Sequence, residues 1–314
     1  MTTCLWSAPC TISLPITFFG SFYVSAPAYI FPRWDVDLFL STTEKEKLTA
    51  GMFATPMVMM ILDSPNLKRY DVSSWRNLWF AGAGIIPSVY KQFIDTFGNI
   101  LGEHHGTTES TGVTTNLSPR DIQDAFDRGD FNILESCGKA SYDMEILVVD
   151  ENNTPVPSGG IGEMIIRGPG ISLGYWRKEE ATKKAFQGEW FHTEDVCSID
   201  EWGYIRVIDR LKDMIITGGE NVYPAEVEKV LHQHPYVKES CVIGTPHPVW
   251  GEAVTAVIVL RNGEAVTPSD FINYCKGKIA GYKVPKIIHF IPEMPRNAAG
   301  KIMKRELREQ FSKN

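Results

Sequence analysis

A lysine near the end of the chain, Lys301, is the residue best placed to do chemistry. It closes the run 295–301 (PRNAAGK), in which small residues and a glycine precede a single cation. Such a loop can carry a point charge into a cleft and withdraw it again. This suits a reaction in which negative charge builds on a carboxylate and a phosphate together. Taken alone, the run is more typical of a basic surface loop.

A second segment, residues 105–112 (HGTTESTG), gathers hydroxyls and one carboxylate between two glycines. Hydroxyls and backbone amides on such a turn can hold phosphate oxygens. The carboxylate of Glu109 can hold the Mg²⁺ that accompanies a polyphosphate. The alternative is a threonine-rich turn that caps a helix and leaves Glu109 in solvent.

Two further acidic residues follow strand-like runs. Asp195 comes after the aromatic pair 190–191, and Asp209 with Arg210 ends another apolar run. A carboxylate at a strand end is the usual ligand for vicinal ribose hydroxyls. The alternative for Asp195 is a simple turn residue.

The run 218–228 (GGENVYPAEVE) begins with two glycines, which let another group pass close to the backbone. Pro224 then marks a helix start, and acidic residues in a first turn suit the helix dipole. For Glu226 and Glu228 a capped surface helix is the favoured interpretation.

The elements that must position these residues change character along the chain. Residues 1–130 alternate strands and helices, with a strand at 78–82 and a helix from 87 to 97, so ligands are expected at strand carboxyl ends. Residues 135–209 predict a small β-rich part, with strands at 144–150 and 162–168. A compact α+β unit follows. It is predicted to hold helices at 225–232, after 267–268 and from 301, and a strand at 253–260.

We therefore place a domain boundary at Lys212, giving domains 1–211 and 212–314. The chain of 314 residues is long enough for two domains. Its net charge of -7 argues against a broad nucleic-acid surface, so an anionic ligand must be held locally.

The cysteines and the N-terminal region indicate the compartment. Six cysteines lack metal-ligand spacing, which favours reduced thiols in a cytoplasmic setting. The apolar stretch 14–31 is interrupted by prolines and follows no basic segment, which disfavours a signal peptide and a membrane span. Buried strands and turns are expected there.

Together these segments resemble the adenylate-forming, or AMP-binding, enzymes: acyl- and aryl-CoA synthetases, luciferases and peptide-synthetase adenylation domains. The run GGENVYP is most similar to bacterial-type CoA ligases. The resemblance implies the second half of a large α/β domain with a small β-rich subdomain, then a small mobile α+β domain. It also implies ATP, Mg²⁺ and CoA as ligands and a carboxylic acid as substrate, with acyl-adenylate and then thioester as products.

The resemblance also implies a role for each matching residue. Lys301 bridges the carboxylate and the α-phosphate, Thr108 holds phosphate, and Glu109 binds Mg²⁺. Asp195 takes the ribose hydroxyls with help from Arg210, and His105 stacks on adenine. Lys212 is the hinge. The nucleotide site is completed by the turn Gly82, Ala83, Gly84 together with Gly106 and Thr107. CoA is faced by Gly218 and Gly219.

The chain departs from the family pattern in several places. The Ser/Thr/Gly-rich phosphate loop that ends in Pro-Lys is absent, which indicates truncation and favours a non-catalytic fragment for this polypeptide. The joint presence of Lys301, Asp195, Arg210, Thr108 and Glu109 favours a ligase instead. His105 stands where tyrosine is usual, Glu194 where glycine precedes the ribose-binding aspartate, and Ile85 where proline follows the adenine turn. The alternatives are a non-catalytic nucleotide- or CoA-binding fragment and an adenylation domain that loads a carrier protein.

Half of a doubly wound sheet should expose apolar edges and faces. We therefore expect poor solubility or self-association as a homo-oligomer, unless the fold has closed that edge. A monodisperse monomer in light scattering would contradict that expectation.

Overall fold

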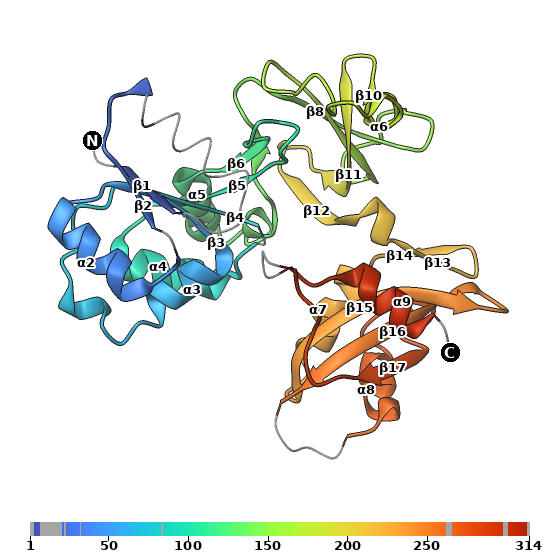
Figure 1. The fold of residues 1–314 in the computed structure, drawn as a ribbon. Coiled ribbons are helices and arrows are strands. Elements are labelled where there is room, and N and C mark those ends of the chain that lie inside the picture. Colours follow the sequence, from blue (N-terminus) through green and yellow to red (C-terminus); the bar gives the residue numbers. More distant parts are fainter. Residues whose placement is uncertain are drawn as a thin grey trace. The chain divides into compact units, whose positions relative to one another are not determined.

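The computed structural model divides the chain into two compact units (Figure 1). The first unit comprises residues 1–193 and 197–207, and the second comprises residues 194–196 and 208–314. The expected boundary at Lys212 falls inside the second unit, and hinge motion there stays a prediction. The structure describes residues 3–6, 21, 23–31, 33–82, 84–261, 266–297 and 301–312.

The first unit is built on a seven-stranded sheet in the order β2-β1-β3-β4-β5-β6-β7. The strands from β2 to β5 pair in parallel, and β6 and β7 add to the edge in antiparallel fashion. Their bounds are β1 (Thr3–Trp6), β2 (Ala28–Phe31), β3 (Ala50–Ala54), β4 (Asn77–Ala81), β5 (Leu101–His105), β6 (Thr115–Leu117) and β7 (Lys139–Ala140).

Helices alternate with these strands, as the sequence predicts. They are α2 (Val36–Glu46), α3 (Thr55–Leu62), α4 (Pro87–Phe97) and α5 (Pro119–Arg128). Pro87 occupies the first turn of α4, and Gly98, with φ of 84°, ends it. Ser118 and Asp121 cap the start of α5 reciprocally. These local signals explain why the predicted helix at 87–97 is confirmed.

The core of this sheet is rich in aromatic side chains. Phe39, Phe53, Phe80 and Phe93 are buried together with aliphatic residues from the strands and helices. Phe39 packs edge-on against Phe53, with ring centroids 5.4 Å apart. Edge-to-face pairs of this kind add to the free energy of simple apolar burial. The strands that end at the predicted site are therefore held by a dense core.

A second sheet has the order β10-β11-β9-β8, with β12 paired to β11. The strand-like runs predicted at 144–150 and 162–168 correspond to β8 and β9, which pair in antiparallel fashion. The bounds are β8 (Glu145–Val149), β9 (Ile161–Arg167), β10 (Phe186–Gln187), β11 (Trp190–Ile199) and β12 (Ile205–Arg210), with helix α6 (Glu179–Ala185) before β10.

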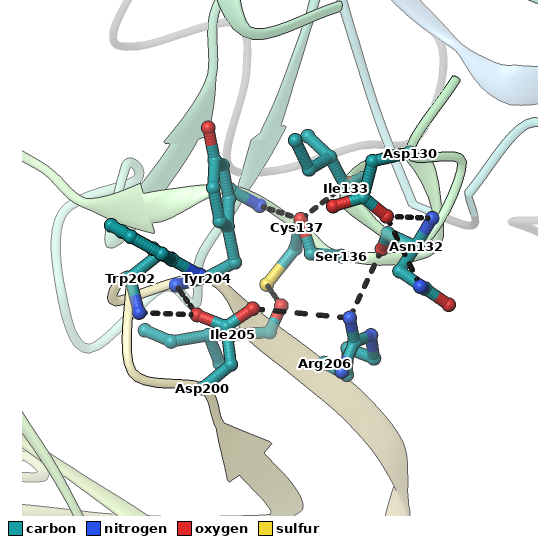
Figure 2. Close-up of polar contacts among 11 residues, drawn as sticks. Asp130, Asn132, Ile133, Ser136, Cys137, Asp200, Trp202, Tyr204, Ile205 and Arg206 are labelled. Atoms are coloured by element: carbon teal, nitrogen blue, oxygen red, sulfur yellow. Dashed lines mark hydrogen bonds and ion pairs between the residues drawn. The ribbon is translucent and has the colours of Figure 1, made fainter. Parts of the chain in front are cut away.

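A polar junction fixes the start of β12 against the segment 130–138 (Figure 2). The Cys137 amide donates to the Ile205 carbonyl at 2.8 Å, and the Ile205 amide donates to the Gly138 carbonyl at 2.9 Å. Asp200 accepts hydrogen bonds from the amides of Trp202 and Tyr204, which shapes the preceding turn. β12, which ends at Arg210, is thereby anchored at its first residue.

The second unit contains a sheet in the order β14-β13-β16-β15, with β17 paired to β16. Alternate residues of β15 face two different cores. Val242 packs with residues of α7 and α8, whereas Cys241 and Ile243 pack with Leu307 of α9. The bounds are β13 (Ile215–Thr217), β14 (Glu220–Val222), β15 (Val237–His247), β16 (Gly251–Leu260), β17 (Ile287–Phe290), α7 (Pro224–Leu231), α8 (Pro268–Cys275) and α9 (Lys304–Phe311).

This α+β layout agrees with the prediction, apart from the last helix. We expected helix from Lys301, but α9 begins at Lys304. Lys301 instead lies before the helix, where backbone pairing holds the chain. The Lys301 carbonyl accepts a hydrogen bond from the Asn297 amide, and Arg296 and Ile302 form an isolated antiparallel β-bridge. Short 3₁₀ turns complete the chain: η1 (Leu67–Arg69), η2 (Ile133–Glu135), η3 (Leu211–Asp213) and η4 (Gly281–Lys283).

Two remaining expectations concern the thiols and the membrane. Cys137, Cys197, Cys241 and Cys275 are buried and free of disulfides. None of the helices that the structure describes has the length and apolar character needed to cross a membrane. Residues 14–20 and 22 of the apolar stretch 14–31 lie outside the described part.

Candidate active site

The loop between β5 and β6, residues 105–112, is folded on itself by its own hydroxyls. The Thr107 amide donates to Ser110 Oγ at 3.1 Å, and the Ser110 amide donates to Thr107 Oγ1 at 3.3 Å. Both residues are buried. A Cβ on Gly106 would lie 1.5 Å from the Gly112 carbonyl oxygen, so the loop can close only with glycine at that position.

This folding separates the roles expected of the two threonines. Thr107 directs its hydroxyl into the loop, where it accepts from Ser110. Thr108 is exposed, and Glu109 is half-buried beside it. Of the hydroxyls predicted to contact nucleotide, that of Thr108 is therefore open to solvent, and Thr107 contributes by shaping the backbone.

The turn after β4 lies next to this loop. In the parallel register of β4 and β5, Ala81 stands opposite His104, so the turn at 82–84 and the loop starting at His105 leave the sheet at neighbouring points. Gly82 and Gly84 are exposed, and a Cβ on either would meet no heavy atom within 4 Å. Ala83 lies outside the described residues. The edge of the sheet thus offers open backbone beside a hydroxyl-bearing loop, where α/β folds place ligands.

Two ionisable groups with shifted pKa values lie just below this edge on β5. Glu103 is 5 % exposed, and burial raises the pKa of its carboxyl to about 7. The hydroxyl of Tyr90, from α4, donates to Glu103 Oε2 at 2.8 Å. His104, on the other face of the strand, stacks on Trp79 with centroids 3.9 Å apart, and burial lowers its pKa to about 4. Neither group was predicted from the sequence, because the run 101–105 (LGEHH) has no apolar pattern that marks a buried strand.

The expected ribose ligand, Asp195, lies in β11 and is 1 % exposed. Arg210, at the end of β12, places Nε 2.6 Å from Asp195 Oδ1, and its own side chain is 46 % exposed. Glu194 adopts a left-handed backbone with φ of 59°. Glycine would adopt that conformation without strain, whereas a residue with a side chain does so less readily. The backbone of β11 is therefore irregular at the residue before Asp195.

Asp209 has a local structural role next to this pair. Its Oδ2 accepts from the Ala225 amide at 2.8 Å, at the start of α7, and its Oδ1 accepts from the Arg210 amide at 2.7 Å. A carboxylate at a helix N-terminus satisfies an otherwise unpaired amide. Asp209 thereby fixes the backbone from which the Arg210 side chain extends.

The remaining predicted residues lie in loops of the second unit. Lys212 is exposed within η3. Gly218 and Gly219 form the two-residue turn between β13 and β14, with φ of 61° and 87°. Two successive positive φ angles are the geometry of a type I′ hairpin, which explains the glycines locally. Lys301 is exposed, and its amide donates to Asn297 Oδ1 at 3.0 Å.

The residues of the 105–112 loop fit a magnesium ion that arrives with phosphate. Among the described residues no group of three or more His, Cys, Asp or Glu side chains could form a dedicated metal cage. Magnesium ordinarily keeps several waters and takes one or two carboxylates plus substrate phosphates. One half-buried carboxylate, Glu109, next to the exposed hydroxyl of Thr108 supplies the oxygen chemistry that such a site needs.

Comparison with known proteins gives two family matches. Residues 2–176 match the model of the AMP-binding enzyme family, and residues 226–301 match that of the AMP-binding enzyme C-terminal domain. A feruloyl-CoA synthase of Amycolatopsis is 35% identical over 278 residues, which cover 88% of this chain and 55% of the relative. A mitochondrial medium-chain acyl-CoA ligase of Danio rerio is 38% identical over 292 residues, covering 90% and 46%.

Solved structures show the same relationship. An amide bond synthetase from Marinactinospora thermotolerans superposes with a TM-score of 0.84 at 29% identity, covering 99% of this chain and 62% of its own. The o-succinylbenzoate CoA synthetase of Bacillus subtilis, solved with an acyl-adenylate, gives 0.84 at 28% identity, covering 98% and 60%. The predicted fold class is confirmed. The chain spans about half the length of the curated relatives it matches.

Proposed function

We propose that this chain, which belongs to the AMP-binding enzyme family, serves an AMP-forming ligase that activates a carboxylic acid and transfers the acyl group to CoA. The observation that carries the proposal is the meeting of two open backbone segments at one sheet edge. The turn at 82–84 and the loop 105–112 leave neighbouring parallel strands there, with Thr108 exposed and Glu109 half-buried. A nucleotide with its phosphates is the ligand that suits amides, hydroxyls and a carboxylate in this arrangement.

In the first proposed step, a carboxylate oxygen of the acid attacks the α-phosphorus of ATP, and the bond to the β-phosphate oxygen breaks to release pyrophosphate. Thr108 and the loop amides hold phosphate oxygens, and Lys301 bridges the carboxylate and the α-phosphate. A bound Mg²⁺ ion, held by Glu109, would neutralise phosphate charge. Electrostatic positioning of this kind accounts for most of the catalysis in phosphoryl-group chemistry.

The nucleoside is held by the other predicted residues. His105 stacks on adenine beside the turn at 82–84, with Gly106 and Thr107 shaping the loop. Asp195 binds the ribose hydroxyls. Because Arg210 covers Asp195 and is half-exposed, its side chain must turn aside to admit ribose, and it can then contact the nucleotide itself.

In the second proposed step, the CoA thiolate attacks the acyl carbon and AMP leaves. Lys212 is the hinge that withdraws the Lys301 loop and presents the hairpin at Gly218 and Gly219 to CoA. An exposed residue in a short 3₁₀ turn can absorb such a rotation with little loss of packing. For the acid we propose an aryl or medium-chain acid, in keeping with the small residues near 53–56 and 81–84.

Pyrophosphate release tests this proposal. The purified chain is assayed with ATP, Mg²⁺ and a panel of aryl and fatty acids, with and without CoA. We expect release with at least one acid and a loss of roughly 3–4 kcal/mol of transition-state stabilisation in Lys301→Ala. Lys238→Ala, an exposed lysine of the same unit, is the matched control and should retain the wild-type rate. Absence of release with every acid would contradict a working ligase.

The same assay identifies the acceptor of the acyl group and tests the alternative that the chain binds nucleotide without turnover. Thioester formed with CoA, rather than an amide with added amines, supports the CoA ligase over the amide-forming chemistry named for one structural relative. AMP binding without pyrophosphate release from any acid would instead favour the alternative function, a nucleotide-binding chain without turnover.

A further inference from the structure

The loop that carries Glu109 is attached to a segment far along the chain, residues 170–175. The Ser172 amide donates to the Glu109 carbonyl at 2.7 Å, and Thr111 Oγ1 donates to the Gly170 carbonyl at 2.9 Å. The third contact is to the side chain: the Tyr175 hydroxyl donates to Glu109 Oε1 at 2.7 Å. The backbone and the carboxylate of Glu109 are therefore both held by one segment.

Tyr175 is held in place by contacts of its backbone and of its ring that do not involve Glu109. Its amide donates to Thr182 Oγ1, from α6, at 2.9 Å. Its ring packs edge-on against Phe186, with centroids 6.0 Å apart. Removing the hydroxyl alone would leave these contacts intact, so Tyr175→Phe should keep the local fold.

The chemistry of this contact differs from that of a salt bridge. Among the described residues Glu109 takes part in no ion pair, and its hydrogen-bond partner is a neutral phenol. A lysine or arginine in the same place would offset the negative charge of Glu109. A phenol fixes the orientation of the carboxylate and leaves that charge available, with Oε2 accepting no hydrogen bond from the described residues.

From this geometry we propose that Tyr175 is a positioning residue for the metal-binding carboxylate of Glu109. Its hydroxyl holds Oε1 so that Oε2 faces a divalent cation that enters with ATP. This inference rests on the proposed function, because it presumes that Glu109 binds the cation of a nucleotide complex. Groups that orient metal ligands in this way typically change metal affinity when removed, more than they change the fold.

Manganese binding provides a direct test. Free Mn²⁺ is measured by electron paramagnetic resonance during titration of the whole chain in the presence of ATP, and AMP affinity without metal is measured by calorimetry. We expect Tyr175→Phe to weaken Mn²⁺ binding roughly 10-fold, at the lower end for groups that orient metal ligands. AMP affinity and the melting temperature should be unchanged. Glu109→Gln should lose the protein-dependent Mn²⁺ site, and the double variant should lose nothing more.

A matched control exists in the same unit. Tyr29 donates to Glu46 Oε2 at 2.6 Å, so Tyr29→Phe removes a tyrosine–glutamate hydrogen bond that lies on β2, away from the loop. It should leave Mn²⁺ affinity at the wild-type value. Equal Mn²⁺ affinity in Tyr175→Phe and wild type, with AMP still bound, would overturn this inference alone. Failure of the wild type to bind AMP or Mn²⁺ with ATP would overturn the proposed function and this inference with it.

Discussion

Two ionisable residues beneath the sheet edge contribute to the way stability depends on pH. Burial raises the pKa of Glu103 to about 7 and lowers the pKa of His104 to about 4. Folding therefore favours the neutral form of each side chain. The stability contributed by neutral Glu103 is complete below its unfolded pKa and is lost as pH rises through about 7. Neutral His104 acts oppositely: its stabilisation is complete above its unfolded pKa and is lost as pH falls through about 4.

Replacing Glu103 with glutamine should isolate its part of this balance. Gln can still accept the Tyr90 hydroxyl but does not ionise, while the His104 contribution is common to both proteins and cancels. Relative to Glu103→Gln, the wild type should lose about 2–3 kcal/mol of unfolding free energy between pH 4.5 and pH 8. Urea unfolding at the two pH values measures this difference. A difference that does not vary with pH would show that folding does not raise the pKa of Glu103.

At the scale of elements, α9 is the helix that supports the Lys301 loop, and ion pairs attach it to the rest of its unit. Arg308 donates to Asp213 at 2.7 Å, with the two side chains 30% and 14% exposed. Lys304 lies 3.4 Å from Glu228, which also accepts from the Val242 amide. Asp213 is adjacent to the proposed hinge, so the segment after Lys212 and the helix after Lys301 are coupled within one unit.

Two arginines of α9 allow this coupling to be tested with a matched pair. Among the ion pairs of the described residues, Arg305 has one, an exposed pair with Glu309 one turn away. We expect Arg308→Ala to destabilise the second unit by about 1–2 kcal/mol, because it leaves a mostly buried carboxylate unpaired. Arg305→Ala should change it by no more than about 0.5 kcal/mol. Hydrogen exchange of β15 and β16 amides reports the stability of this unit. Similar exchange in both variants would mean that the Arg308 pair contributes nothing.

The same elements show what could be predicted from the sequence. Pro87 and Gly98 bracket α4, and Pro224 starts α7, because proline and glycine act on the backbone locally. The predicted start of α9 was wrong, because the backbone hydrogen bond between Asn297 and Lys301 leaves no periodic pattern in the sequence. Tyr175 was missed because its partner Glu109 is 66 positions away, and only the fold brings them together.

At the scale of the whole molecule, the proposed function requires one small domain to serve two reactions. Lys212→Pro tests this requirement, because proline restricts both its own φ and the backbone of the preceding residue. We expect adenylation, followed as pyrophosphate release, to continue near the wild-type rate while thioester formation falls at least about 10-fold, as for other hinge positions. Rapid-quench assays of the separate steps measure both rates. Equal losses in the two steps would contradict a hinge at this position.

Calorimetric titration of AMP into the whole chain and into Asp195→Ala tests the proposed nucleotide site. If the chain holds a nucleotide through its ribose, the wild type will bind AMP, and the variant will lose binding while remaining folded by circular dichroism. Equal AMP affinity in the two proteins would contradict the placement of ribose at Asp195. Absence of AMP binding by the folded wild type would contradict the nucleotide site itself.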